Sequence, residues 1–162
     1  KALSECAGEI PGYREDLEIH LTGVVGEEIL ESLKACGLDA YCKHLPYVSH
    51  PKAVVLQRRS QLLLLAEIDS EHTRAIIPGK LFEYMASRRP ILGIGPEGWE
   101  AADMIREHEL GAVFTHSDQS ELKAQLTRWY EEFKAGTLEP TRANIMAYSR
   151  KALTAKLATL LK

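Results

Sequence analysis

A regular alternation of short apolar runs with longer segments of helical periodicity most constrains the fold of this chain. The helical segments separate the apolar runs, as crossover connections separate parallel strands. This order predicts an α/β fold, a doubly wound parallel sheet with helices on both faces. The 162 residues are enough for one domain with its own core, so we expect a single domain over residues 1–162. The five expected strands lie within residues 17–25, 41–48, 61–68, 90–95 and 111–116.

Two of the strands and the last helix carry more detailed predictions. The run "QLLLLAEI" (61–68) does not alternate apolar with polar residues, which is typical of a strand buried on both faces. Pro46 lies near the end of segment 41–48 and favours an outer strand. The tail 148–162 has the pattern of an amphipathic helix, and we expect its inward side to carry Leu153, Leu157 and Leu160.

Composition narrows the classes of function. The formal net charge of −3 offers no basic field for phosphates, so we expect no nucleic-acid partner. No apolar run approaches the ~20 residues of a membrane span, and no signal-peptide pattern is present, so we expect a cytoplasmic protein. The histidines show no metal-ligand spacing, so we expect neither a metal site nor a resident cofactor. We expect free thiols at Cys6, Cys36 and Cys42.

Gly93, Gly95 and Gly98 form the pattern G-x-G-x-x-G between an expected strand and an expected helix. Such glycines can place a dinucleotide pyrophosphate at a helix start. Asp118 follows near the end of the next strand, where a carboxylate can bind ribose. An NAD-binding oxidoreductase domain is therefore one alternative.

A structural interpretation of the same glycines is simpler. Pro90 leaves only two residues before Gly93, which predicts Gly93 inside the strand, where a missing side chain lets a helix pack closely. Pro96 removes a backbone donor that a phosphate would need. Asp118 and Glu121 have the spacing of a capping box for the next helix. We expect the glycines mainly to shape a strand and its exit.

The segment 78–89 predicts a helix with a candidate anion site at its start. Lys80 stands in the first turn, where the helix dipole disfavours a cation unless an anion is bound. Lys80, Glu83 and Ser87 share one face by their spacing. This face could hold phosphate at one end and sugar hydroxyls at the other. The alternative is a solvated face with an ordinary Lys80–Glu83 pair.

The run "IPGKLFEYMASRRPILGIGPEG" (77–98) resembles the nucleotide-sugar-binding segment of GT-B glycosyltransferases of the retaining, family-4-like group. The order of elements over about residues 15–135 is similar to their C-terminal domain. The resemblance implies a domain that binds a nucleotide-diphosphate sugar, within an enzyme that transfers the sugar to an acceptor saccharide or lipid-linked acceptor. It also implies an N-terminal acceptor domain that is missing here, so we expect this piece alone to be inactive. Peripheral contact with the inner membrane face would come through the full-length protein.

The resemblance also implies roles for individual residues. Glu83 matches the glutamate that binds the ribose hydroxyls, and Gly79 and Lys80 match the helix start near the pyrophosphate. The remaining expected nucleotide contacts are Gly23, Tyr47, Val48 and Ser49. Expected contacts to the donor sugar or the phosphates are His72, Arg74, Ile77, Pro78 and Gly98.

Two departures from the family pattern matter. Ala75 stands where many members carry a second glutamate, which puts the usual sugar contact in question. The family also has a central strand ahead of residue 1, and helical spacing without a cap at Ala2, Leu3 and Cys6 suggests that the chain begins inside an element. If the gap closes, the five strands take the order 2-1-3-4-5, unless a neighbouring chain supplies the strand. A non-catalytic flavodoxin-like interaction module is a further alternative, and it predicts no nucleotide affinity.

Overall fold

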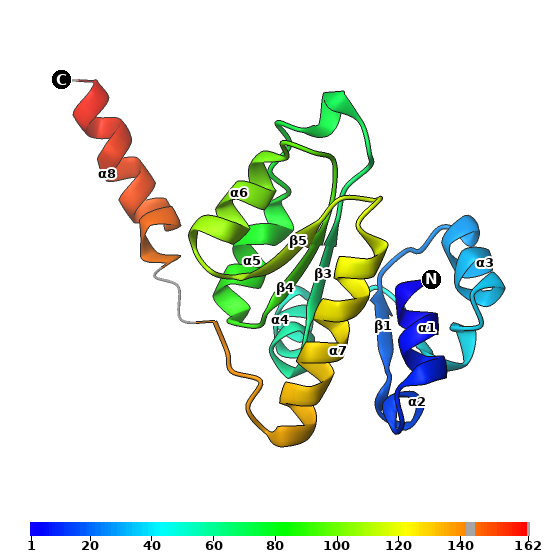
Figure 1. Cartoon of the computed structure of the whole chain (residues 1–162). Helices are drawn as coiled ribbons and strands as arrows, with labels where there is room; N and C mark the ends of the chain where they lie inside the picture. The colour runs from blue at the N-terminus through cyan, green and yellow to red at the C-terminus, as the bar shows by residue number, and fades with distance from the viewer. Residues whose placement is uncertain (142–144, 162) are drawn as a thin grey trace. The chain divides into compact units, whose positions relative to one another are not determined.

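The computed structural model describes residues 1–141 and 145–161, and the chain divides into two compact units (Figure 1). The first unit holds residues 1–56 and 117–138, and the second holds residues 57–116 and 139–162. Both contain parallel strands and helices, so the predicted α/β class is confirmed. That the whole chain acts as one domain stays a prediction.

The first unit contains a two-stranded sheet. Strand β1 (Ile19–Thr22) runs parallel to β2 (Cys42–Leu45), with Ile19 opposite Cys42 and Thr22 opposite Leu45. Within the described residues β2 pairs with β1 alone, in line with an outer strand next to Pro46. The unit also holds α1 (Ala2–Glu9), α2 (Tyr13–Asp16), α3 (Glu27–Ala35), the 3-10 helix η1 (Asp39–Tyr41), most of α4 (His50–Arg59) and α7 (Gln119–Ala135).

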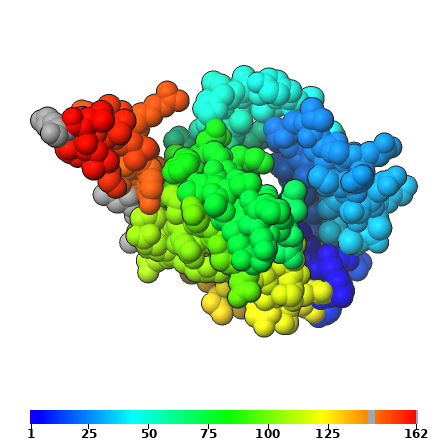
Figure 2. Space-filling view, turned by 90° about the horizontal axis from the view of Figure 1, so that it is seen from above, coloured from blue at the N-terminus to red at the C-terminus, as the bar shows by residue number. Residues whose placement is uncertain are grey.

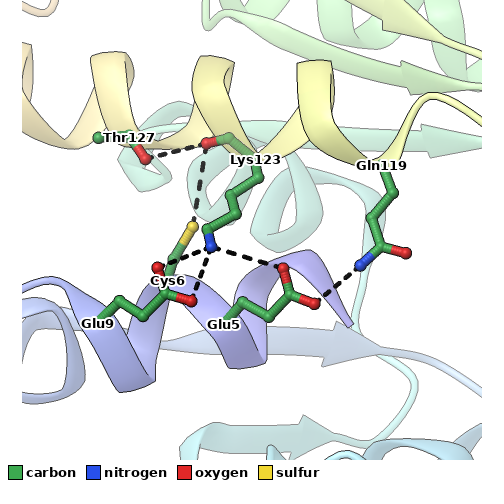
Figure 3. A network of polar contacts seen from close by, with 6 residues as sticks. All are labelled: Glu5, Cys6, Glu9, Gln119, Lys123 and Thr127. Atoms are coloured by element: carbon green, nitrogen blue, oxygen red, sulfur yellow. Dashed lines mark hydrogen bonds and ion pairs between the residues drawn. The ribbon is translucent and has the colours of Figure 1, made fainter.

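Helices α1 and α7 of the first unit are joined by polar contacts (Figure 3). Lys123 on α7 places Nζ 2.7 Å from Glu9 Oε2 and 3.6 Å from Glu5 Oε2. Gln119 Nε2 donates to Glu5 Oε1 at 2.9 Å. The hydrogen bond from Lys123 to Glu9 raises the pKa of that lysine, and burial raises the pKa of the Cys6 thiol between them. Charged and polar pairs therefore connect the two helices around a buried thiol.

The second unit contains a three-stranded parallel sheet in the order β3-β4-β5. In β3 (Leu63–Ala66) and β4 (Ile91–Ile94), Leu63 lies opposite Ile91, and Ile91 in turn lies opposite Gly111 of β5 (Gly111–Phe114). The helices of this unit are α5 (Gly79–Ser87), α6 (Glu100–Glu107), α8 (Arg150–Leu160) and the 3-10 helices η2 (Glu71–Thr73) and η3 (Ile145–Tyr148).

An apolar core joins α5 and α6 to the three-stranded sheet. Its members are no more than 2% exposed: Leu65, Leu81, Met85, Ile91, Trp99, Ala101, Ala102, Ile105 and Leu110. Gly93 lies inside β4, and a Cβ there would stand 3.0 Å from Val113 Cγ2 and 3.3 Å from Ile105 Cδ1. The expectation that Gly93 sits within the strand and lets a helix pack closely is therefore confirmed.

The single five-stranded sheet in the order 2-1-3-4-5 is not found. The described strands form separate sheets, and β1 and β3, which that order makes neighbours, belong to different ones. Local alternation of strand and helix patterns predicts parallel strands, but it does not encode which strand edges share hydrogen bonds. One edge of β1 and one edge of β3 therefore lack a partner strand among the described residues.

Two burial predictions are wrong. Strand β3 alternates, with Leu63 and Leu65 buried and Leu64 56% exposed, so it is not covered on both faces. The leucines of α8 that were expected to point inward are also exposed, by 48% at Leu153, 56% at Leu157 and 76% at Leu160. An apolar pattern shows which surface an element can bury, but not whether a neighbouring element covers that surface.

The predicted capping box of α7 is also absent. Asp118 occupies the N-cap position, but its side chain makes no capping hydrogen bond. Its backbone (φ −81°, ψ 47°) is not in the extended conformation that a capping side chain normally requires. The Glu121 carboxylate instead accepts a hydrogen bond from Ser120 Oγ at 2.7 Å.

Candidate functional site

The candidate site of the second unit lies where β3 and β4 end. Residues 67–78 lead from β3 to α5, passing through η2 at the top of Figure 1, and residues 95–99 lead from β4 to α6. The sheet hydrogen bonds continue up to these loops, since Glu67 N donates to Ile94 O at 2.8 Å. In Figure 2, seen from above, the segment after β3 and the start of α5 (green) lie at the surface. Ligands of open α/β sheets bind at this end of the strands.

The start of α5 has the features of an anion site. Pro78 is the N-cap, no side chain caps the helix by a hydrogen bond, and its first turn carries no acidic residue. Lys80 lies in that turn and is exposed. A Cβ at Gly79 would meet no atom within 4 Å, so packing does not require glycine there. Helix N-termini bind anions through their backbone N–H groups, so the start of α5 is a candidate anion site.

Glu83 lies one turn further along α5 and is held from α4. Gln57 Nε2 donates a hydrogen bond to Glu83 Oε2 at 3.1 Å. The oxygen of the same amide lies 3.0 Å from Ser87 Oγ, and that hydroxyl also lies 2.9 Å from the Glu83 carbonyl oxygen. Ser87 is 6% exposed, so this arrangement is partly removed from water. The contact from Gln57 orients the Glu83 carboxylate.

Gln57 was not anticipated from the sequence. It lies 26 residues before Glu83, on helix α4, which has no buried residue. Its one distinguishing feature is a neutral polar side chain that precedes the basic pair Arg58 and Arg59. No spacing rule links it to Glu83, because the two residues meet only after the helices pack.

The loop between β3 and α5 is fixed to the start of α6. Trp99 is fully buried, and its Nε1 donates to Ile76 O at 2.7 Å. Glu100 N donates to Arg74 O at 2.8 Å. Trp99 is therefore a packing residue. Ile77 and Pro78 follow directly, so Trp99 also helps to fix the approach to α5.

His72 and Arg74 lie in this loop with exposed side chains. The His72 amide donates to Ser70 Oγ at 3.3 Å, and Arg74 Nη2 stands 3.5 Å from Glu71 Oε1. The loop thus places a cationic side chain at the ligand-binding end of the sheet. Contacts from His72, Arg74 or Ile77 to a donor remain predictions.

Each glycine of the G-x-G-x-x-G pattern has a structural reason. Gly93 makes room for Val113 and Ile105, as described above. A Cβ at Gly95 would stand 2.5 Å from Trp99 Cε3, so Gly95 admits the indole ring. Gly98 has φ +71°, a left-handed conformation that favours glycine. The pattern therefore does not require a bound pyrophosphate.

The residues expected around a nucleotide base lie in the first unit, after β1 and β2. Gly23 has φ +101°, its amide donates to Leu45 O at 3.0 Å, and its carbonyl oxygen lies 2.9 Å from His44 Nε2. Tyr47 is 87% exposed, and Val48 and Ser49 follow it before α4. The base-binding role of these residues stays a prediction.

Among residues 1–141 and 145–161, no three histidine, cysteine or acidic side chains gather in a way that could hold a metal ion. No helix in the same part of the chain is long and apolar enough to cross a bilayer.

The chain has an α/β fold similar to part of a solved glycosyltransferase structure. The similarity is to the crystal structure of WaaG, a glycosyltransferase involved in lipopolysaccharide biosynthesis, with a TM-score of 0.65 and 16% sequence identity. The match covers 84% of this chain and 34% of WaaG, so the chain spans about a third of that protein's length. No protein-family model and no curated protein sequence matches the chain.

Proposed function

We propose that this chain is the nucleotide-sugar-binding domain of a retaining, family-4-like glycosyltransferase. It would bind a nucleotide-diphosphate sugar, while the acceptor saccharide or lipid-linked acceptor is held mainly by another domain of the same protein. The fold shared with WaaG supports this, as does the resemblance of residues 77–98 to the donor-binding segment of the family. The proposal assigns no metal ion and no resident cofactor.

The observation that carries the proposal is the arrangement of α5. Its uncapped start lies beside open space at Gly79, with Lys80 in the first turn and the oriented Glu83 carboxylate one turn later. The diphosphate would accept hydrogen bonds from the first backbone N–H groups, and Lys80 would balance its charge. When the sugar leaves, the same groups stabilise the charge that develops on the diphosphate.

Glu83 would accept hydrogen bonds from the two ribose hydroxyls. A hydrogen bond to a carboxylate stabilises a complex by about 1.5–3 kcal/mol. Gln57 would act as a positioning residue, because its amide holds Glu83 Oε2 and so fixes the plane of the carboxylate. It makes no contact with the donor in this proposal.

Titration calorimetry of the chain with UDP, GDP, ADP and NAD tests the proposal. We expect saturable binding of at least one nucleoside diphosphate, without sugar transfer by this chain alone. Glu83→Gln should weaken that binding roughly tenfold or more, the factor that 1.4 kcal/mol represents. Glu107→Gln is the matched control. It removes an exposed carboxylate at the C-terminal end of α6 and should bind the nucleotide as the wild type does.

Ribose recognition has its own test. A 2′,3′-dideoxy nucleotide should bind the wild type weakly and lose little further affinity in Glu83→Gln. Gln57→Leu should weaken binding of the parent nucleotide by less than Glu83→Gln does. It should leave the affinity for the dideoxy compound unchanged. Saturable binding of NAD alone, or equal affinity of wild type and Glu83→Gln for the parent nucleotide, would contradict the proposal.

A further inference from the structure

A buried hydroxyl lies behind the contact from Gln57 to Glu83. Ser87, at the last position of α5, is the one buried polar residue among residues 1–141 and 145–161. Its Oγ lies 3.0 Å from Gln57 Oε1 and 2.9 Å from the Glu83 carbonyl oxygen. Because a buried polar group is costly unless it is hydrogen-bonded, the choice of acceptor for this hydroxyl affects its neighbours.

The Ser87 hydroxyl has a single proton, so it donates fully to only one of these two acceptors. The Glu83 carbonyl lies within α5, and helix carbonyl oxygens accept from the backbone N–H four residues further on. The Gln57 side-chain oxygen has no other donor in the part of the chain that the structure describes. Donation to Gln57 therefore satisfies the acceptor that otherwise lacks a protein partner.

The same donation decides which end of the Gln57 amide faces Glu83. An amide can present either its donor nitrogen or its acceptor oxygen to a neighbour, because the two orientations have nearly the same shape. Glu83 Oε2, 3.1 Å from Gln57 Nε2, accepts from the nitrogen. A reversed amide would bring two acceptor oxygens together, and Ser87 would then have to accept a hydrogen bond instead of donating one. The hydroxyl and the carboxylate thus favour the same orientation of the amide.

We propose that Ser87 is a positioning residue that acts through Gln57 to orient the Glu83 carboxylate for the 2′- and 3′-hydroxyls of ribose. A carboxylate that is fixed before the ligand arrives loses less freedom on binding. A site built to bond both hydroxyls disfavours an analogue that lacks one of them. We therefore expect selection of a ribonucleoside diphosphate over its 2′-deoxy analogue. The ribose role rests on the proposed function, whereas the relay from Ser87 through Gln57 to Glu83 does not.

NMR of the chain without nucleotide tests the relay directly. The side-chain amide signal of Gln57 is assigned by its loss in Gln57→Leu. In the wild type it should differ in chemical shift from the signal of the exposed Gln61 and exchange more slowly with water. In Ser87→Ala it should move toward the Gln61 signal and exchange faster. Ser32→Ala, at an exposed serine of α3, is the matched control and should leave the signal unchanged. An unchanged Gln57 signal in Ser87→Ala would overturn the proposal.

Titration calorimetry measures the consequence for ribose recognition. The probes are whichever of UDP, GDP and ADP binds the wild type, and its 2′-deoxy analogue. Ser87→Ala should weaken binding of the ribonucleotide about threefold, the size of one indirect hydrogen bond, and change the affinity for the deoxy analogue less. Ser87→Cys, which keeps a weaker donor, should give an intermediate affinity. Circular dichroism should show that both variants stay folded. Equal losses for the two nucleotides would overturn the proposal.

A double variant shows whether Ser87 acts through Gln57. If it does, Ser87→Ala combined with Gln57→Leu should bind the ribonucleotide as Gln57→Leu alone does. Independent residues would instead give losses that multiply, to about ninefold for two threefold losses, and this result would overturn the proposal. If the wild type binds no nucleotide, the proposed function and the ribose role of Ser87 both fail. The Gln57 signal would still show whether the relay exists.

Discussion

The two compact units are stabilised by different kinds of contact. In the second unit, α5 and α6 bury an apolar core against the sheet, and Trp99 in this core is fully buried. In the first unit, α3 has no buried residue, and the residues of β1 are at best half-buried. Its helices α1, α2 and α7 are joined by charged and polar pairs beside buried side chains that include Tyr13, Leu126 and Trp129.

This difference has consequences for stability and for the site. Apolar packing depends little on pH or salt, whereas exposed ion pairs depend on both. The second unit should therefore keep its geometry over a wide range of conditions. The second unit also carries Glu83, Gln57 and the start of α5. The residues of the candidate site that must keep fixed relative positions therefore belong to the more apolar unit.

The largest expected effect is at Trp99. Trp99→Ala removes the ring that covers Gly95 and the hydrogen bond to Ile76 O, and it leaves a cavity in the core. We expect a loss of about 3–5 kcal/mol in the free energy of unfolding. Urea unfolding followed by circular dichroism measures it, with Trp99→Phe as a milder variant that keeps an aromatic ring. A loss below about 1 kcal/mol would show that the core does not depend on this residue.

Gly93→Ala should have the next largest effect. Its added methyl group meets the side chains of Val113 and Ile105 at 3.0 and 3.3 Å, which must give way. Overpacking of this kind costs about 1–3 kcal/mol. The variant should lose stability in urea yet keep its nucleotide affinity under native conditions. A variant with unchanged stability and lost nucleotide binding would assign the glycine to a phosphate site instead.

The sequence predicts the features of the fold that depend on local patterns, and it does not predict those that depend on contacts between distant segments. The element order and the place of Gly93 inside a strand depend on local patterns, such as the two residues between Pro90 and Gly93. The separation of the strands into two sheets and the exposure of Leu64 depend on which elements become neighbours. Local spacing does not encode such neighbours.

The candidate site was partly predictable for the same reason. Lys80 and Glu83 share a face because they are three residues apart on one helix, which spacing alone predicts. The contact between Gln57 and Glu83 joins two helices and could not be found from spacing. The predicted capping box at Asp118 is wrong because the backbone there takes another conformation, although the side-chain pattern is present.

The first unit should respond to the loss of a single charge. Lys123→Met keeps the aliphatic stem of the side chain but removes its contacts with Glu5 and Glu9. We expect a smaller loss of stability than at Gly93, because surface ion pairs contribute little. The loss should shrink at high salt, and Lys34→Met on α3 is the control for a general charge effect. A loss that is independent of salt would show that packing of the stem, and not the charge, joins α1 to α7.

The smallest expected effect concerns Asp16 and appears only in acid. Lys134 Nζ and the Tyr130 hydroxyl both donate to Asp16 Oδ2, at 2.9 and 2.8 Å. The hydrogen bond from Lys134, with a further one from Tyr130, holds the pKa of Asp16 below its usual range. A carboxyl group whose pKa is lower in the folded state stabilises the fold above its unfolded pKa of about 3.9. That stabilisation is lost as the pH falls through the folded-state pKa. In Asp16→Asn the melting temperature should therefore be lower than in the wild type at neutral pH, and the two melting temperatures should converge as the pH falls below about 4.

Asp103→Asn, which removes an exposed carboxylate from α6, controls for net charge. If Asp16→Asn and the wild type keep a constant difference down to acid pH, the pairing with Lys134 and Tyr130 does not contribute to the stability of the first unit.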